Sequence, residues 1–319
     1  MYSNNRILSA VAIATVSLAF VGADKATLRG KPADSWPQWR GPERNGVSAD
    51  QGLLQQWPEA GPRLTWRATG LGAGFSGISL AGGRIYTMGD IDGKQQIVCL
   101  AQADGKKLWT SPVGEVWDPK GYSGPRSTPT IDGNLVFAVG THGDLVCVDA
   151  ASGQEKWRKN YGKDYQGKMH SGWGFSESPL VDDDRLICTP GGPEAMLVAL
   201  DKQSGNEIWK CKLPAIGDRG GDGAAYASVV ISAAGGVKQY VQLVGRGVMS
   251  ARASDGKFLW GYNRIANNVA NIPTPLVQDD YVFCSSGYGT GAALLKLAAE
   301  GDGVQANEVY FLEAKELQN

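Results

Sequence analysis

The sequence has few of the residues and motifs that usually carry catalysis or metal binding. Among its 319 residues are two histidines and five cysteines, with no adjacent pair of cysteines and no Cys-x-x-Cys. It also has no Gly-x-Ser-x-Gly elbow, no phosphate-binding loop and no closely spaced pair of histidines. These absences argue against the common hydrolase, nucleotide-binding and zinc-binding classes.

The sequence also lacks a large net charge, with a formal value of −1, and a long apolar run. There are 31 Lys and Arg against 32 Asp and Glu, so we expect no nucleic-acid partner, which would require a basic footprint. The apolar run at 7–21 is shorter than the ~20 residues of a membrane span. With Arg6 before it and small residues up to Ala23, it predicts a signal peptide, and hence an exported, periplasmic or secreted protein that is not integral to a membrane.

What the sequence does contain is a fourfold repeat. Each copy has an apolar run, a polar turn with glycine, three further residues and a tryptophan. The copies are VCLAQADGKKLW (98–109), VCVDAASGQEKW (146–157), LVALDKQSGNEIW (197–209) and VMSARASDGKFLW (248–260). Their tryptophans are spaced by 48, 52 and 51 residues. A period near 50 residues with strand-like segments is typical of a β-propeller.

A β-hairpin pattern precedes each copy, with an apolar run, a turn rich in Asp or Gly, and a β-branched or aromatic run. Hairpin and tryptophan unit together predict four antiparallel strands, which form one propeller blade. The predicted blades cover 75–111, 127–160, 176–213, 226–262 and 271–314. The fifth blade lacks the Gly-x-x-x-Trp unit, and we expect its last two strands at 292–303 and 307–314. The fold class is therefore an all-β propeller of four-stranded antiparallel blades.

The repeated tryptophans are expected to be structural. An indole ring fills the wedge between two twisted sheets, and its N–H satisfies a buried carbonyl. The glycine four residues before it suits a turn with positive φ. We assign this docking role to Trp66, Trp109, Trp157, Trp209 and Trp260.

Trp66 stands apart from the others, in a lone strand-like segment at 62–70. Propellers often close by letting an N-terminal strand complete the last blade. We therefore expect an incomplete ring, with five of seven or eight blades present. The alternative is a five-blade ring in which Trp66 lies on an extra strand.

The chain divides into a signal peptide at 1–23, a strap segment at 24–61 and the propeller at 62–319. We expect Trp36 and Trp39 of the strap to pack on the propeller's rim. Cys99 and Cys147 occupy equivalent positions in neighbouring blades. A disulfide between them is one interpretation, but equivalent positions in adjacent sheets can lie too far apart to be bridged. We expect all five cysteines to be small, buried apolar side chains.

A binding site is expected where the long connections meet. Strands alternate in direction, so the loops between blades share one face with the turns between second and third strands. Loops that cluster on a rigid scaffold commonly carry function. The candidate binding residues on this face are Arg126, His142, His170, Trp173, Glu177, Asp222, Tyr226, Arg246, Asn268 and Asn271.

The two histidines with Glu177 could bind a transition metal. They lack ligand-like spacing, however, so we favour loop residues that hydrogen-bond neighbouring blades. We predict no catalytic residue and no metal site.

The units VDAASGQEKW (148–157) and ALDKQSGNEIW (199–209) resemble the repeat of the quinoprotein-like β-propellers. That family includes alcohol dehydrogenases dependent on pyrroloquinoline quinone, and BamB-type scaffolds that bind no cofactor and act in outer-membrane protein assembly. The dehydrogenases carry two adjacent cysteines over the quinone, which are absent here. The resemblance offers Glu177, Asn268 and Asp222 as counterparts of their calcium and base residues by location only.

The leading hypothesis is an exported, non-catalytic propeller that binds a protein or peptide on its long-loop face and needs no cofactor. The alternative is an alcohol or sugar dehydrogenase that uses pyrroloquinoline quinone and Ca²⁺.

Overall fold

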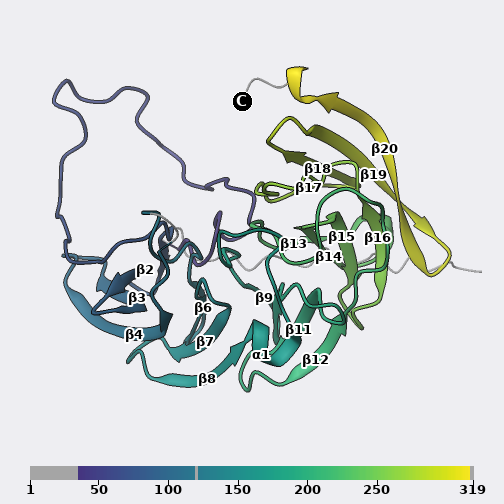
Figure 1. The fold of residues 1–319 in the computed structure, drawn as a ribbon. Coiled ribbons are helices and arrows are strands. Elements are labelled where there is room, and N and C mark those ends of the chain that lie inside the picture. The colour runs from purple at the N-terminus through teal and green to yellow at the C-terminus, as the bar shows by residue number, and fades with distance from the viewer. Residues whose placement is uncertain (1–34, 119–120, 317–319) are drawn as a thin grey trace, which may run out of the picture. The chain divides into compact units, whose positions relative to one another are not determined.

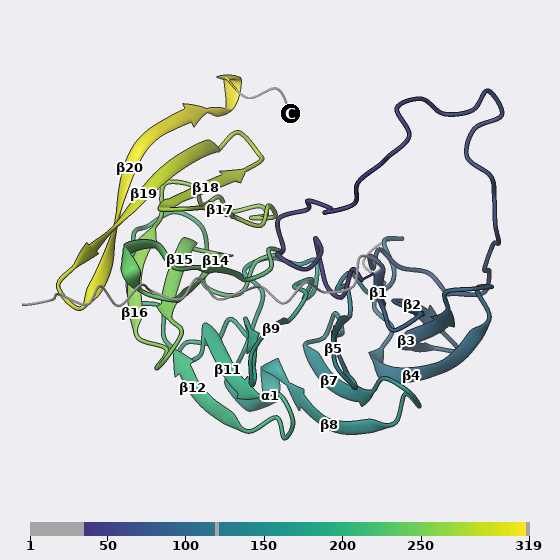
Figure 2. The same ribbon diagram turned by 180° about the vertical axis from the view of Figure 1, so that it is seen from behind.

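The computed structural model describes residues 35–118 and 121–316, which belong to one compact unit. These residues form five separate four-stranded antiparallel sheets, each with its strands in chain order. Figures 1 and 2 show the sheets following one another around a common centre, with the first strand of each nearest the centre and the fourth outermost. This arrangement confirms the predicted propeller, with each sheet as one blade.

The strand bounds agree closely with the predicted blades. The first blade contains β1 (Ser79–Ala81), β2 (Arg84–Ile91), β3 (Lys94–Ala101) and β4 (Lys107–Glu115). The second contains β5 (Thr130–Asp132), β6 (Leu135–Val139), β7 (Asp144–Asp149) and β8 (Glu155–Asn160). The third contains β9 (Leu180–Asp182), β10 (Arg185–Cys188), β11 (Leu197–Asp201) and β12 (Glu207–Cys211). The fourth contains β13 (Val230–Ser232), β14 (Gln239–Val244), β15 (Gly247–Arg252) and β16 (Phe258–Tyr262). The fifth contains β17 (Leu276–Gln278), β18 (Tyr281–Ser286), β19 (Gly291–Glu300) and β20 (Gly303–Glu313).

Helix is confined to one short α-helix, α1 (Tyr161–Tyr165), and the 3₁₀ turns η1 (Ala234–Gly236) and η2 (Ala314–Glu316), within the described part of the chain. None of these is long or apolar enough to cross a membrane. In the fifth blade, β19 and β20 are joined by a two-residue turn, so β20 begins four residues earlier than predicted. The predicted signal peptide at 1–23 lies outside the described residues.

The core consists of apolar layers between neighbouring sheets. Strand β6 shows the principle, because all five of its residues are buried. Phe137 packs in the layer toward the third blade, while Val136 and Ala138 pack in the layer toward the first. The inner strands therefore have continuous apolar sequences, since neighbouring blades cover both faces of the sheet.

Each layer is closed by an indole ring that lies on the glycine turn of the following blade. A Cβ built on Gly153 would lie 2.6 Å from the ring of Trp109, and the ring N–H of Trp109 donates to the Ala150 carbonyl at 3.3 Å. The same pairing joins Trp66 to Gly105, Trp157 to Gly205 and Trp209 to Gly256. These glycines have φ between 72° and 75°, as the turn prediction requires.

Trp260 is the exception, because the fifth blade has no Gly-x-x-x-Trp turn to receive it. Its N–H donates instead to Oε1 of Gln239 within its own blade, at 2.7 Å. The aromatic residue in the equivalent place on the fifth blade is Tyr310. Tyr310 pairs with Leu294 of β19, and the register of the ladder shifts between Leu294 and Leu295. The repeat tryptophans stand at the same kind of register shift, as Trp260 does opposite Ser250. Tyr310 is 41% exposed.

Trp66 takes the docking position predicted for it, but residues 62–70 form no strand. Its ring N–H donates to the Gln102 carbonyl at 3.0 Å. The five cysteines are buried and unpaired, as expected. Burial raises the pKa of Cys99 to about 11 and that of Cys147 to about 12, so both thiols stay neutral.

The strap residues do not pack on the rim, which corrects that expectation. Trp36 exchanges backbone hydrogen bonds with Leu80 of β1, and the Ile131 N–H in β5 donates to the Pro37 carbonyl. Both strands are innermost strands. The segment 36–46 therefore lies across the centre of the propeller, because the first strands offer backbone groups there that no strand partner uses.

Arg44 anchors this segment and is 3% exposed. Its Nη1 donates to the Ser178 and Val229 carbonyls at 3.0 Å, and its Nη2 donates to the Ser178 and Pro179 carbonyls. Its Nε donates to Oε1 of Gln38 at 2.9 Å. One guanidinium thus joins the third blade to the fourth. Burial lowers the pKa of Arg44 to about 9, opposed by the charge of Glu177.

The glycine turns give a stability prediction. Gly153→Ala places a methyl group against the Trp109 ring at positive φ, so the free energy of unfolding should fall by about 3–4 kcal/mol. Gly133→Ala is the control, because Gly133 also has positive φ (58°) but nothing lies within 4 Å of its Cβ position. It should cost about 1–2 kcal/mol in urea unfolding. Equal losses would show that the ring contact contributes nothing.

The buried guanidinium of Arg44 gives a second stability prediction. Arg44→Met leaves the Ser178, Pro179 and Val229 carbonyls without this donor, and should reduce the free energy of unfolding by about 3–5 kcal/mol. Arg40→Met is the matched control, because Arg40 makes one exposed bond to the Asn45 carbonyl. It should change stability by at most about 0.5 kcal/mol. The idea fails if both variants unfold at the same urea concentration.

Candidate functional site

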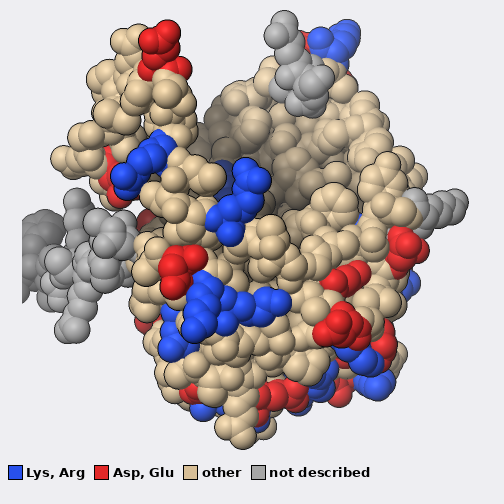
Figure 3. Space-filling model, turned by 90° about the vertical axis from the view of Figure 1, so that its left-hand side faces the viewer, with Lys and Arg blue, Asp and Glu red and all other residues tan. Residues whose placement is uncertain are grey.

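A cavity of about 670 Å³ opens at the centre of the propeller, on the face of the long loops. The strap, the inner strands and the loops between successive blades all contribute to it. Its lining residues are Trp39, Arg40, Phe75, Tyr122, Arg126, Trp173, Ser176, Ser178, Tyr226, Ser228, Ala270, Ile272, Pro273, Thr274, Leu276, Phe283, Ser285 and Tyr288. Figure 3 shows one side of the molecule, hollowed in its upper half, with both signs of charge on a largely uncharged surface.

Several aromatic residues of the cavity are exposed to solvent. Phe75 is 60% exposed, Tyr288 61% and Tyr122 55%. Tyr122 meets Trp173 edge to face, with ring centroids 5.8 Å apart, and the two come from different interblade loops. Large exposed rings gathered in one concavity are typical of a binding surface.

A ladder of hydroxyl groups forms part of the cavity wall. The N–H of Thr128 donates to Oγ of Ser178 at 3.0 Å, the N–H of Ser178 to Oγ of Ser228 at 2.9 Å, and the N–H of Ser228 to Oγ1 of Thr274 at 3.1 Å. Each bond joins the innermost segment of one blade to that of the next. The residues recur at spacings of 50, 50 and 46 because each precedes the first strand of its blade.

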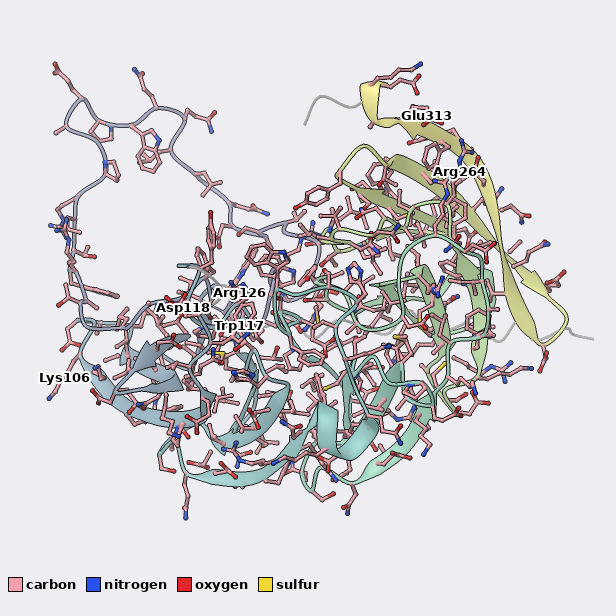
Figure 4. All side chains as sticks on the ribbon, in the orientation of Figure 1. Lys106, Trp117, Asp118, Arg126, Arg264 and Glu313 are labelled. Atoms are coloured by element: carbon pink, nitrogen blue, oxygen red, sulfur yellow. The ribbon has the colours of Figure 1, made fainter. Side chains whose placement is uncertain are left out.

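Arg126 is held in a fixed orientation at the cavity. Its Nη1 donates to the Gly124 carbonyl and its Nη2 to the Tyr122 carbonyl, both at 2.7 Å. The guanidinium carbon lies 4.8 Å from the centroid of the Trp117 ring and 5.3 Å from that of Phe75. Figure 4 shows Arg126 beside Trp117. Burial lowers the pKa of Arg126, opposed by the tyrosine at 226 and by Asp90.

Tyr226 organises the adjoining loop. Its hydroxyl lies 2.6 Å from Oγ of Ser171 and accepts the N–H of Trp173 at 3.3 Å. His170 packs its ring against Tyr226 with centroids 5.8 Å apart, and both ring nitrogens of His170 are buried without a partner among the described residues. Burial lowers the pKa of His170.

Of the ten candidate residues, Arg126, Trp173 and Tyr226 line the main cavity. Asp222 and Arg246 form an ion pair of 2.8 Å and line a second cavity of about 530 Å³ between the third and fourth blades. His142 is exposed, with Nε2 3.4 Å from the Val116 carbonyl, and Asn268 is exposed.

Glu177 and Asn271 are turned inward and hold loops in place. Oε1 of Glu177 accepts the Tyr161 hydroxyl at 2.8 Å and the Thr189 N–H at 2.6 Å, and burial raises the pKa of this carboxyl. Nδ2 of Asn271 donates to the Val244 and Gly245 carbonyls. Both side chains are buried, Glu177 with 2% and Asn271 with 0% of its surface exposed, and neither lines the cavity.

The residues do not fit the calcium site that the quinoprotein resemblance offered. Glu177 is bonded beneath the cavity, Asp222 is paired to Arg246 in the second cavity, and Asn268 lines neither. Among the described residues, no group of three or more His, Cys, Asp or Glu side chains could hold a metal ion.

Sequence reasoning missed several lining residues. Trp39 and Arg40 belong to the strap, which contacts residues far from it in the sequence. The repeat of about 50 residues therefore gives no indication of where they lie. Ser178, Ser228 and Thr274 did carry a signal, because a Ser or Thr stands two residues before the first strand of the second, third, fourth and fifth blades. Phe75 and Tyr288 carried none, as isolated aromatic residues in irregular segments.

The chain's two histidines make a direct titration test possible. The imidazole resonance that is missing from the ¹H NMR spectrum of His170→Gln belongs to His170. In the unmodified protein this resonance should titrate with a pKa below the ordinary value near 6.5. The pKa of His170 is then higher in the unfolded chain than in the folded protein, so the unfolded chain is protonated at a higher pH. The contribution of His170 should therefore lower the free energy of unfolding as the pH falls below about 6.5. His142→Gln serves as the control and should leave that resonance in place. Titration of the His170 resonance at or above the ordinary value would contradict the assignment.

Comparison with known proteins extends these observations. A relative from Burkholderia pseudomallei, named outer membrane protein assembly factor BamB, is 28% identical over 166 residues, which cover 51% of this chain and 38% of the relative. The crystal structure of BamB from Moraxella catarrhalis matches with a TM-score of 0.54 at 14% identity, over 78% of this chain and 66% of that one. The chain thus matches less than two thirds of either protein.

A quinohemoprotein alcohol dehydrogenase from Pseudomonas putida HK5 has the same fold, with a TM-score of 0.57 at 16% identity over 87% of this chain and 48% of that one. At such identities, the structural matches establish the fold alone. The family model described as outer membrane protein assembly factor BamB matches residues 93–310. Because that match covers more than half of the chain, the protein belongs to this family.

Proposed function

We propose that the protein is an exported, non-catalytic binding propeller, whose central cavity holds a segment of a protein partner. The observation that carries this proposal is the composition of the cavity. Cores of protein–protein interfaces are enriched in Tyr, Trp, Phe and Arg and depleted in Lys, Asp and Glu. The lining of the main cavity follows that pattern, with seven aromatic residues and two arginines, and without Lys, Asp or Glu among the described residues.

The openness of the cavity supports a macromolecular partner. Pockets for small molecules bury most of their ligand's surface. Here the rings of Phe75, Tyr122 and Tyr288 are each more than half exposed. Such rings give up much water when a polypeptide covers them, and buried aromatic residues are the usual energetic centres of interfaces.

Family membership supports the biological setting of the proposal. The family model and the relatives carry the name outer membrane protein assembly factor, so we place this protein in the assembly of outer-membrane proteins, outside the cytoplasm. The segment at 1–23 is proposed as its signal peptide and 62–319 as its binding propeller. No cofactor is part of this function.

The alternative, an alcohol or sugar dehydrogenase with pyrroloquinoline quinone and Ca²⁺, is supported by the likeness of fold. The residues weigh against it, because Glu177 and Asp222 are committed to other partners and Asn268 lines neither cavity. We therefore derive no reaction step through the quinone.

Site-specific cross-linking tests the proposal. A photoreactive phenylalanine analogue in place of Tyr288, in the cavity, should give cross-linked adducts of discrete mass with another protein in the cells that produce this chain. The same analogue in place of Ile208 is the control, because Ile208 is 43% exposed on the outer strand β12. Adducts of the same mass and yield at both positions, or at neither, would refute a partner in the cavity.

A further inference from the structure

The charge of the main cavity is one-sided. Its described lining contains two guanidinium groups, of Arg40 and Arg126, and no carboxylate. Neither arginine makes an ion pair within the described residues, whereas Arg246 on the same face is paired to Asp222 at 2.8 Å. The cavity therefore presents positive charge that no described side chain neutralises by contact.

Arg126 is also preorganised. Two backbone carbonyls and two aromatic rings fix its guanidinium, so a ligand need not pay to order the side chain. Asp90 contributes a charge in the neighbourhood but makes no hydrogen bond to Arg126 among the described residues. Carboxylates are the natural partners of a planar, fixed guanidinium, through short charge-assisted hydrogen bonds.

The hydroxyl ladder adds donors of the same kind. Ser178, Ser228 and Thr274 each accept a backbone N–H through the side-chain oxygen, and none of the three hydroxyls donates to another described residue. Their hydrogens thus remain available for an oxygen of a ligand. Both Ser178 and Ser228 are 3% exposed, so unused donors there favour a bound acceptor.

We propose that the partner segment bound in this cavity carries a carboxylate next to an aromatic side chain. The carboxylate accepts hydrogen bonds from Arg126, and the aromatic side chain packs against the exposed rings of Phe75, Tyr122 and Trp173. The ladder hydroxyls donate to carbonyl oxygens of the segment. This inference rests on the proposed binding function and adds the chemistry that the site recognises.

An acidic oligosaccharide is the competing ligand class, because it also combines carboxylates with a face that stacks on aromatic rings. Sugar hydroxyls are hydrogen-bond donors and need acceptors. The described lining has no Asp, Glu, Asn or Gln side chain to accept from them. That composition favours a polypeptide.

Two capped peptides that differ only in charge, Glu-Trp-Glu-Phe-Glu and Gln-Trp-Gln-Phe-Gln, test the inference by calorimetric titration of the full chain, with trigalacturonate as a third probe. The glutamate peptide should bind about tenfold or more tightly than the glutamine peptide. Equal affinity of the two peptides would overturn the acidic specificity and leave the binding function standing. Binding of trigalacturonate alone, or of no probe, would overturn both.

Two variants locate the effect. Arg126→Gln should weaken the glutamate peptide about tenfold and leave the glutamine peptide within about twofold. Arg264→Gln is the matched control, because Arg264 also stacks on a ring, that of Phe311 at 3.8 Å, but is neutralised by Glu308 and Glu313 outside the cavity. Figure 4 shows Arg264, in the loop after β16, near Glu313 of β20.

The control should bind both peptides like the unmodified chain. An Arg126→Gln variant that keeps the preference for glutamate overturns the assignment to this residue. If that variant does not fold, as circular dichroism would show, the comparison of the two peptides on the unmodified chain still decides the inference.

Discussion

The contact between an indole ring and the glycine turn of the next blade is the constraint on which this molecule depends. Each sheet must meet its neighbour at a wedge angle, and the wedge is widest at the outer strands, where small residues cannot fill it. The ring of Trp157 fills that space and lies so close to Gly205 that no side chain fits at this turn. Repetition of this contact fixes the angle between successive blades. That angle in turn brings four interblade loops to one mouth, so the position of the binding face follows from the packing of its outer edge.

The centre of the propeller poses the opposite problem, because backbone groups of the first strands have no neighbouring strand beyond them. Unsatisfied buried backbone groups are costly, and two devices satisfy N–H groups and carbonyls here. The hydroxyls of Ser178, Ser228 and Thr274 join neighbouring blades in series, and the guanidinium of Arg44 collects three carbonyls from two blades. The strap is therefore an integral part of the scaffold. Its path across the centre also brings Trp39 into the cavity, so one segment both stabilises the fold and shapes the site.

Most of the fold was predictable from sequence because its signals are local. A glycine turn and a tryptophan four residues later identify each outer hairpin, and this placed four blades within a few residues. The fifth blade was harder, since Tyr310 is recognised as the docking aromatic only through the bulge that precedes it in the ladder. The site was less predictable. Topology assigned Arg126, Trp173 and Tyr226 to the long-loop face, and all three line the cavity, but it could not show that Glu177 turns inward toward Tyr161. Trp39 and Arg40 were missed because a strap docks through long-range contacts that leave no period in the sequence.

Three arginines illustrate why the function is assigned to the cavity rather than to charge in general. Arg44 is saturated by carbonyls and the Gln38 side chain, so nothing remains for a ligand. Arg264 stacks on Phe311 but is neutralised by two glutamates. Arg126 has the stacking and the fixed orientation, no carboxylate of residues 35–118 or 121–316 pairs with it, and it faces an open cavity. A guanidinium that is ordered, partly desolvated and not neutralised costs stability in the free protein. The binding of an anionic segment offsets that destabilisation, so the same arrangement that makes Arg126 destabilising in the free protein makes it selective for an anionic partner.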